Sequence, residues 1–118
     1  PESRFFGFDS FEGLPESWHA NPKGTFSTEG KFPEIDDERV NFVKGWFEET
    51  LPPFLSSYEQ KNRLVVHFDA DIYSATLFAL VHLIPFVEKG TVVMFDEFSD
   101  ARHEFSAFLH FIEAIKCQ

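Results

Sequence analysis

The chain has 118 residues, 43% of them hydrophobic, and its 20 acidic and 10 basic side chains give a formal net charge of -10. This length predicts one domain, and 17 phenylalanines provide enough aromatic area for a core, which excludes a disordered chain. The charge argues against nucleic acid and membranes as partners, and the single cysteine, Cys117, excludes an internal disulfide and fits a reducing compartment such as the cytoplasm.

The first predicted element is a strand over Arg4–Phe8, which ends at Asp9. An acid at the end of a strand in a nucleotide-binding sheet typically holds ribose hydroxyls, whereas Asp9 could equally begin a turn. The next stretch, from Phe11 to Pro33, contains three glycines and three prolines. A stretch this long and this broken predicts a functional loop or lid rather than a plain connection.

The second predicted strand covers Val40–Val43 and is followed by a short helix that begins near Phe47. We expect this helix to end near Leu51, because two prolines follow and proline lacks the N–H that a helix needs. Trp46 and Phe47, just past the strand, lie where nucleotide-binding α/β folds bind an adenine ring. Core packing is an equal alternative for both side chains.

Two apolar runs, Leu64–Phe68 and Thr91–Phe95, predict a strand–helix–strand unit with parallel strands. Because neither run alternates apolar with polar residues, both faces of these strands are expected to be covered. Ser74 is suited to cap the helix between them, and Gly90 is suited to the return turn.

A last helix is predicted from Asp100 to Lys116, and its apolar positions recur at helical spacing. These positions form the expected core face: Phe105, Phe108, Leu109, Ile112 and Ile115. Together the elements predict an α/β fold, an open sheet of four mainly parallel strands with helices packed on it.

Each of the two later strands is followed by a pair of acids, Asp69 and Asp71 after the first and Asp96 and Glu97 after the second. The carboxyl ends of neighbouring parallel strands meet at one edge, where open α/β sheets bind ligands. Carboxylates that converge there need a proton or a cation among them, and an all-oxygen set suits Mg²⁺, with Ca²⁺ or Mn²⁺ as alternatives. The competing interpretation is that these acids cap helices or face solvent.

Five segments form one ordered pattern: GFDSFEGLPESW (7–18), GTFST (24–28), GWFEETLPPFL (45–55), HFDADIYSAT (67–76) and VVMFDEF (92–98). Together they resemble the macrocin O-methyltransferase family, class I S-adenosylmethionine-dependent enzymes that methylate sugar hydroxyls of natural products. The resemblance covers nearly the whole chain. It implies a partial Rossmann-like class I methyltransferase fold in one incomplete domain over residues 1–118, with a small-molecule hydroxyl acceptor as partner.

The resemblance also implies roles for individual residues. In that family the first aspartate of the D-x-D segment and the two acids after the next strand bind Mg²⁺, and the matching residues here are Asp69, Asp96 and Glu97. The second aspartate of the segment, Asp71, is the implied general base. The family further suggests Asp9 for the ribose of S-adenosylmethionine.

Parts of the family pattern are absent from this sequence. The first strand and the glycine-rich loop, which hold the methionine part of the cofactor, are expected before Pro1, and closing antiparallel strands are expected after Gln118. Without the first strand the sheet has a gap, so we expect either direct pairing of the strands at Arg4 and Leu64 or a homo-oligomer that completes the sheet. Catalysis by the isolated chain is left open.

Two other functions remain as alternatives. One is a non-catalytic methyltransferase-like fragment. The other is a metal-dependent glycosyltransferase-type protein that binds a nucleotide sugar, in which a strand also ends in D-x-D, but this does not explain the segment over residues 7–18. An aspartate-nucleophile phosphatase would need Thr or Val two places after the second aspartate, where the chain has Tyr73.

Overall fold

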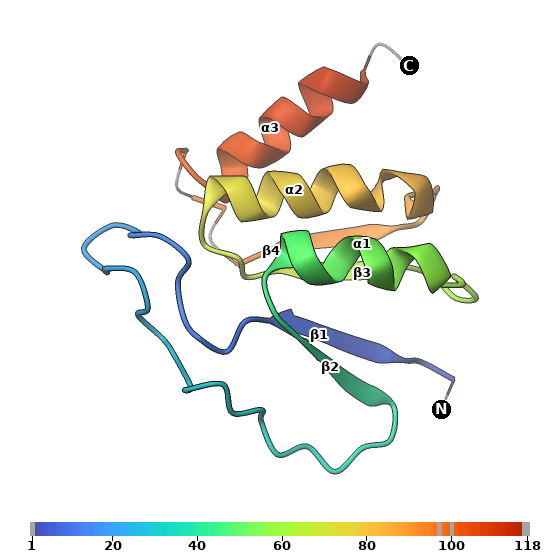
Figure 1. The fold of residues 1–118 in the computed structure, drawn as a ribbon. Coiled ribbons are helices and arrows are strands. Elements are labelled where there is room, and N and C mark those ends of the chain that lie inside the picture. The colour runs from blue at the N-terminus through green and yellow to red at the C-terminus, as the bar shows by residue number, and fades with distance from the viewer. Residues whose placement is uncertain (1, 97, 100, 117–118) are drawn as a thin grey trace. The chain divides into compact units, whose positions relative to one another are not determined.

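The computed structural model describes residues 2–96, 98–99 and 101–116. The elements in chain order are β1 (Phe5–Asp9), β2 (Val40–Lys44), α1 (Phe47–Ser57), β3 (Val65–Phe68), α2 (Tyr73–Leu83), the 3-10 helix η1 (Ile84–Phe86), β4 (Val92–Phe95) and α3 (Glu104–Ile115), as Figure 1 shows. They cluster into two compact units, Pro1–Ser56 and Ser57–Gln118. Each unit contains a parallel pair of strands and at least one helix, so the predicted α/β class is confirmed.

In the first unit β1 and β2 lie side by side as a parallel pair (Figure 1), with Asp9 opposite Lys44 at the carboxyl end. Both strands begin and end within one residue of the predicted positions. Gly7 allows close packing within this pair, because a Cβ at that position would lie 2.8 Å from Cδ1 of Phe42.

Helix α1 continues through the prolines that were predicted to end it near Leu51. Pro52–Pro53 lies inside the helix, so two carbonyls of its first turn lose the amide donor that other residues would supply. Packing offsets this loss, because the ring of Phe54 meets the rings of Phe6 and Phe8 edge-on, both at 4.9 Å. Tertiary packing of one face therefore decides where this helix ends, rather than local propensity.

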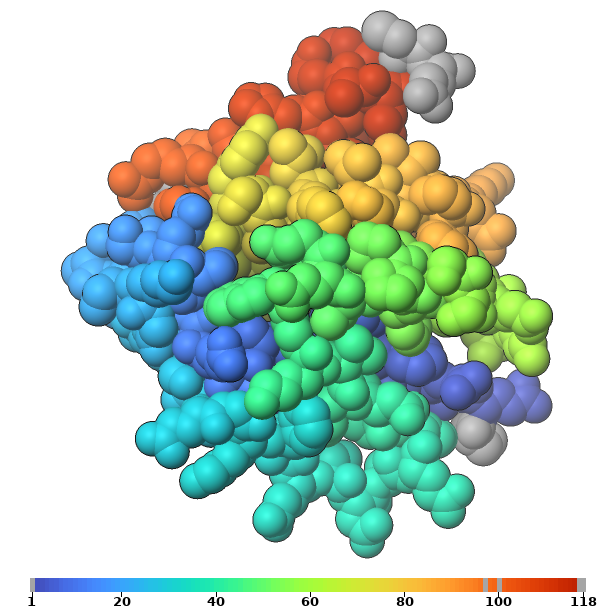
Figure 2. All heavy atoms as spheres, in the orientation of Figure 1, coloured from blue at the N-terminus to red at the C-terminus, as the bar shows by residue number. Residues whose placement is uncertain are grey.

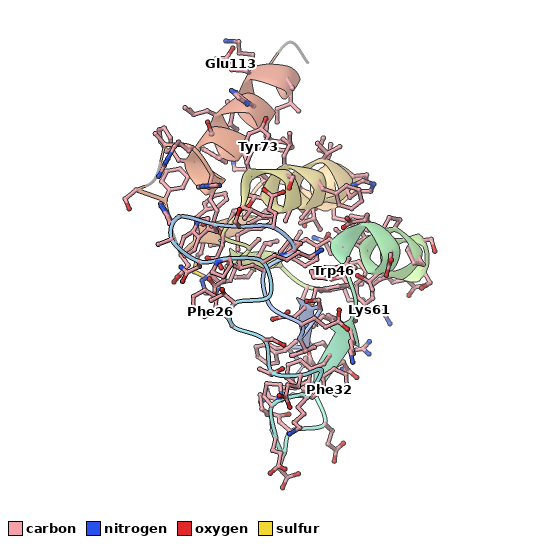
Figure 3. The ribbon with its side chains drawn as sticks, turned by 60° about the vertical axis from the view of Figure 1, so that its left-hand side comes forward. Phe26, Phe32, Trp46, Lys61, Tyr73 and Glu113 are labelled. Atoms are coloured by element: carbon pink, nitrogen blue, oxygen red, sulfur yellow. The ribbon has the colours of Figure 1, made fainter. Side chains whose placement is uncertain are left out.

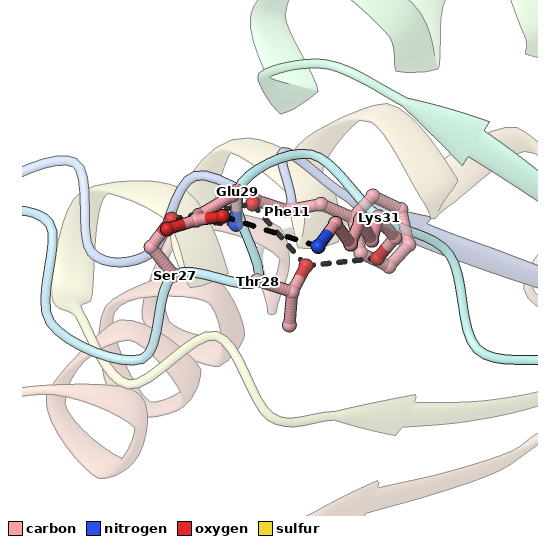
Figure 4. A network of polar contacts seen from close by, with 5 residues as sticks. All are labelled: Phe11, Ser27, Thr28, Glu29 and Lys31. Carbon is pink, nitrogen blue, oxygen red and sulfur yellow. Dashed lines mark hydrogen bonds and ion pairs between the residues drawn. The ribbon is translucent and has the colours of Figure 1, made fainter.

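The segment between β1 and β2 is a loop that closes on the main-chain oxygen of Phe11, and Figure 4 shows this network. The oxygen accepts hydrogen bonds from the amides of Thr28 at 3.2 Å and Gly30 at 2.8 Å, and from the Thr28 hydroxyl at 3.3 Å. Nearer its middle, the amide of Leu14 donates to the carbonyl of Thr25 at 2.9 Å. The loop therefore has a hydrogen-bonded frame of its own, and its predicted role as a lid stays a prediction.

In the second unit β3 and β4 pair in parallel along their whole length, and α2 connects them through η1. Gly90, with a φ of +100°, supplies the return turn that the sequence predicted. The prediction for Ser74 is wrong, because the N-cap of α2 is Ile72 and Ser74 lies within the helix. The carbonyl of Ile72 already accepts a bond from the amide of Thr76 at 3.2 Å, which starts the helix before Ser74.

Helix α3 begins at Glu104, later than predicted, and the face that it buries differs in part from the predicted one. The buried positions are Glu104, Ala107 and Phe111, and Figure 2 shows α3 packed directly against α2. Leu109 and Ile112, which were predicted in the core, are 45% and 38% exposed. This helix has apolar residues on most of its sides, so the sequence alone did not show which side contacts α2.

Within the second unit, the described residues cover the β3–β4 sheet on one face only, although cover on both faces was predicted. On the covered face the ring of Phe95 lies 5.4 Å from that of Phe108 in α3. The side chains of the other face are all exposed: Val65, His67, Val92 and Met94. The apolar runs therefore identified the strands correctly but not their surroundings.

The described strands form two two-stranded sheets instead of one sheet of four. Direct pairing of the strands at Arg4 and Leu64 was one of two predicted alternatives, and it is not among the described strand pairs. Each sheet instead joins strands that are consecutive in the sequence, which is the commonest pairing. None of the helices in the described ranges is long and apolar enough to cross a bilayer.

Candidate functional site

The carboxyl ends of β3 and β4 bring two of the predicted site acids to one edge. Asp69 and Asp96 directly follow Phe68 and Phe95, which are paired residues at the ends of the two strands. The amide of Asp96 donates to the carbonyl of Phe68 at 2.9 Å, so the ladder continues past the strands. The two aspartates thus lie on adjacent backbones, about 4.8 Å apart by strand spacing, and both are exposed.

The third predicted metal ligand, Glu97, lies outside the described residues. Within residues 2–96, 98–99 and 101–116, no group of three His, Cys, Asp or Glu side chains is placed to hold a metal ion. The carboxylate oxygens of Asp69 and Asp96 are the donor type that hard divalent cations prefer. Metal binding by this edge stays a prediction.

Asp71, the predicted general base, lies in a tight turn between β3 and α2. Its φ is +61°, and the amide of Ile72 donates to the carbonyl of Ala70 at 2.6 Å. This bond spans three residues and closes a γ-turn centred on Asp71. Positive φ is strained for most residues, and aspartate is one of the few that adopt it more readily. The backbone therefore leaves its extended path here, and the Asp71 side chain is half-buried where that of Asp69 is exposed.

Two fully buried polar side chains hold the ends of this turn. Oε1 of Glu104 accepts a hydrogen bond from the amide of Ala70 at 3.1 Å, and the hydroxyl of Thr76 donates to the carbonyl of Ile72 at 2.9 Å. Both side chains are 0% exposed. The sequence analysis missed Glu104. No signal in the sequence marks it, because spacing alone does not show which face of α3 is buried.

A polar contact also joins the helices that flank this turn. The hydroxyl of Tyr73, the first residue of α2, lies 2.7 Å from Nδ1 of His110 in α3. Figure 3 labels Tyr73 at the start of its helix. The two rings meet edge-on, with centroids 5.5 Å apart. This exposed pair ties α2 to α3 close to Asp71, and the sequence analysis missed it as well.

The predicted cofactor residues gather at the carboxyl edge of the other sheet, in the first unit. The amide of Gly45 donates to the carbonyl of Asp9 at 3.0 Å, which brings the end of β1 beside the start of the segment with Trp46 and Phe47. Oδ1 of Asp9 accepts the amide of Phe11 at 2.8 Å, so Asp9 begins a turn, as its alternative interpretation predicted. Trp46, labelled in Figure 3, and Phe47 are half-buried. Cofactor binding by this set stays a prediction.

A hollow of about 460 Å³ lies at the opposite edge of the β3–β4 sheet. It is lined by Gln60–Arg63, before β3, and by Pro85–Gly90, before β4. Asp69 and Asp96 follow the carboxyl ends of the same strands, so this hollow is separate from the candidate site.

Comparison with known proteins gives one family and one fold. The family model of the macrocin-O-methyltransferases (TylF) matches residues 27–117. The crystal structure of CalS11, a calicheamicin methyltransferase, superposes with a TM-score of 0.74 at 24% sequence identity, over 95% of this chain and 51% of that chain. At this identity the match shows the fold alone.

Three curated relatives match parts of the chain. The 8-demethyl-8-(2,3-dimethoxy-alpha-L-rhamnosyl)-tetracenomycin-C 4'-O-methyltransferase of Streptomyces olivaceus is 35% identical over 75 residues, 58% of this chain and 27% of that protein. The mycinamicin III 3''-O-methyltransferase of Micromonospora griseorubida is 32% identical over 76 residues, 58% of this chain and 28% of that protein. The demethyldecarbamoylnovobiocin O-methyltransferase of Streptomyces niveus is 36% identical over 65 residues, 55% of this chain and 23% of that protein. The matched segments thus span about a quarter of the length of these relatives.

Proposed function

The chain belongs to the macrocin-O-methyltransferase (TylF) family, since the family model matches most of it, and we propose that the whole protein methylates a hydroxyl group of a sugar or another natural product. The resemblance in the five ordered segments predicted this family, and that prediction is confirmed. The three relatives are named as O-methyltransferases of natural products, and one name includes a rhamnosyl group. The methyl donor in this proposal is S-adenosylmethionine.

The observation that carries the proposal is the edge of the β3–β4 sheet, where Asp69 and Asp96 lie on adjacent backbones and a tight turn follows with Asp71. Such an edge suits an acceptor that carries neighbouring hydroxyls, because carboxylates accept hydrogen bonds from them. This edge is also where open α/β sheets bind ligands, outside the carboxyl ends of the strands.

In the proposed reaction Asp71 is the general base. Its carboxylate accepts the proton of the acceptor hydroxyl while the oxygen attacks the methyl carbon. A carbon–oxygen bond forms and the bond between methyl carbon and sulfur breaks, with its electron pair left on sulfur. The products are an O-methyl ether, neutral S-adenosylhomocysteine and a protonated Asp71, which loses its proton to solvent before the next turnover.

Asp69, Asp96 and Glu97 are the residues that would hold a divalent cation, Mg²⁺ in this proposal. When bound, the cation would lower the pKa of the acceptor hydroxyl and would hold its oxygen in a fixed position. In the first unit, Asp9 would accept hydrogen bonds from the ribose hydroxyls of the donor. Trp46 and Phe47 would contact its adenine.

The test compares Asp69→Asn with Asp71→Asn in the whole protein. We expect Asp71→Asn to lower kcat about 100-fold while leaving Mg²⁺ affinity within about threefold, because it removes the base and no proposed ligand. Asp69→Asn should weaken Mg²⁺ binding and methyl transfer together. Calorimetry with Mg²⁺ and a methyl-transfer assay on glycosylated natural products measure the two effects.

The matched control is Glu113→Gln, which also removes one carboxylate. Glu113 is exposed near the end of α3 (Figure 3) and pairs with Lys116 at 2.8 Å. This variant should bind Mg²⁺ and turn over like the parent. If Asp69→Asn behaves like Glu113→Gln in both assays, the acids at the sheet edge are structural. If the parent transfers no methyl group to any acceptor tested, the non-catalytic alternative holds.

A further inference from the structure

Glu104 is a buried carboxyl side chain in a setting that favours apolar residues. It is the first residue of α3 and is 0% exposed, and the other buried residues of that helix are Ala107 and Phe111. Burial of a carboxyl group costs free energy unless hydrogen bonds compensate for the lost water. An apolar residue of similar size would fill this position without that cost. The presence of Glu therefore needs a specific reason.

The contact with Ala70 supplies one. Oε1 of Glu104 accepts the Ala70 amide at 3.1 Å, across 34 positions of sequence, so the bond links α3 to the loop after β3. Ala70 stands between Asp69 and Asp71, the first proposed metal ligand and the proposed base. Its carbonyl accepts the amide of Ile72 at 2.6 Å. Both polar groups of the Ala70 backbone are thus engaged, one by Glu104 and one within the γ-turn.

The strained backbone explains why such a link is needed. A residue with positive φ costs about 1–2 kcal/mol and persists only where its surroundings hold it. Asp71 has a φ of +61°. Without the bond to Glu104, the Ala70 amide would be free to rotate, and the turn could relax towards an ordinary conformation. The Asp71 carboxylate would then move away from its place in the folded turn.

We propose that Glu104 is a positioning residue for the proposed methyl transfer: it holds the Ala70 amide, and thereby the γ-turn centred on Asp71. The role of Asp71 rests on the proposed function, whereas the hold on the turn does not. Glu104 contacts the backbone of the turn, and its effect on the reaction passes through Asp71.

The alternative is that Glu104 has a structural role only and stabilises α3. An acid in the first turn of a helix interacts favourably with the helix dipole, at about 0.3–1 kcal/mol. In that case its loss would lower stability and leave the turn and kcat unchanged. The two roles therefore differ in measurable ways.

The first measurement is amide hydrogen exchange of the whole protein, resolved at Ala70, in Glu104→Ala, Glu104→Gln and Phe111→Leu. Glu104→Ala removes the acceptor, so we expect exchange at Ala70 to quicken at least about tenfold beyond any change in global stability. Glu104→Gln keeps an Oε1 acceptor and should retain the protection. Phe111→Leu destabilises the same buried face of α3 without touching the turn, and should leave Ala70 protected.

The second measurement is methyl-transfer kinetics with the same variants. Glu104→Ala should lower kcat about 10–100-fold with little change in KM for S-adenosylmethionine, because a displacement of about 1 Å at a reacting group costs up to about 100-fold. Glu104→Gln should restore kcat to within about threefold of the parent. If Glu104→Ala does not fold, Glu104→Asp replaces it, since its shorter side chain withdraws the carboxylate from Ala70.

The outcomes separate the two proposals. Unchanged exchange at Ala70 in Glu104→Ala overturns the hold on the turn, whatever the protein catalyses. Quickened exchange with unchanged kcat overturns the link to catalysis. A parent without methyl-transfer activity refutes the proposed function, and the exchange measurement still decides whether Glu104 holds the turn.

Discussion

The ion pair of Asp37 and Arg39 shifts the pKa of a carboxyl group. Two side-chain hydrogen bonds from Arg39, at 3.0 and 2.6 Å, together with its amide and its charge, lower the pKa of Asp37 from 3.8 to about 2. The folded pKa is below the unfolded one. The stabilising contribution is therefore complete above about pH 4 and is lost as the pH falls from 3.8 towards 2.

We expect Arg39→Ala to return the pKa of Asp37 towards 3.8, because it removes the main cause of the shift. An NMR titration of the Asp37 carboxyl carbon between pH 1.5 and 6 measures it. Lys116→Ala, which breaks the exposed pair with Glu113, is the control and should leave Asp37 unchanged. A carboxyl that titrates near 3.8 in the parent contradicts the described contact. Because both side chains of the Asp37 pair are partly exposed, added salt should weaken the shift.

The residues of the candidate site were predictable to different degrees. Asp69 and Asp96 were foreseen because each follows an apolar run, and parallel strands bring such ends together. The tight turn at Asp71 and the buried Glu104 that holds it were not foreseen. Sequence spacing gives no sign that the chain leaves its extended path after Asp69. Nor does it show which α3 position faces a loop 34 residues earlier.

At the scale of elements, the loop between β1 and β2 contains two glycines that test its frame. Gly13 and Gly24 have φ values of +84° and +86°, so alanine is strained equally at both. A Cβ at Gly13 would overlap the main-chain oxygens of Gly24 and Thr25, whereas a Cβ at Gly24 meets nothing within 4 Å. The two positions thus differ in crowding and not in backbone strain.

We expect Gly24→Ala to lower the free energy of unfolding by about 1 kcal/mol, the cost of positive φ. Gly13→Ala should lower it by about 1–3 kcal/mol more, because the backbone must move to admit the methyl group. Urea unfolding of both variants beside the parent measures the difference. Equal losses in the two variants would mean that the loop does not close as described.

The strands of this fold were easier to predict from the sequence than the helix ends. All four lie within one residue of their predicted bounds, because short apolar runs bounded by turn residues have few other interpretations. Helix α1 was predicted too short, because proline propensity is local and the packing of Phe54 on β1 is not. The buried face of α3 was predicted correctly only in part. Phe108 packs on Phe95, but Leu109 is exposed, since an apolar residue fits the core and the surface equally well by spacing.

At the scale of the whole molecule, the predicted homo-oligomer is still to be tested. Two-stranded sheets are marginal on their own, and their edges are templates for further pairing. The described strands form two such sheets. We therefore expect this chain to associate in solution, with a mass at least twice 13.7 kDa.

Light scattering over a range of concentrations measures that mass. The net charge of -10 makes copies repel each other, so association should strengthen as salt is raised from about 0.01 to 0.3 M. A mass of 13.7 kDa at every concentration and salt level would show that the chain does not complete its sheets by association.

The loop between β1 and β2 closes on the carbonyl of Phe11, and that oxygen belongs to the main chain. No substitution deletes such an atom, and two of its partners, the amides of Thr28 and Gly30, are main-chain groups too. Side chains over residues 15–23, which lie outside this closure, can therefore be exchanged while the closure is preserved. In its predicted role as a lid, the loop would let an engineer randomise residues 15–23 when a new acceptor is sought. The same arrangement would let evolution change substrates without rebuilding the scaffold.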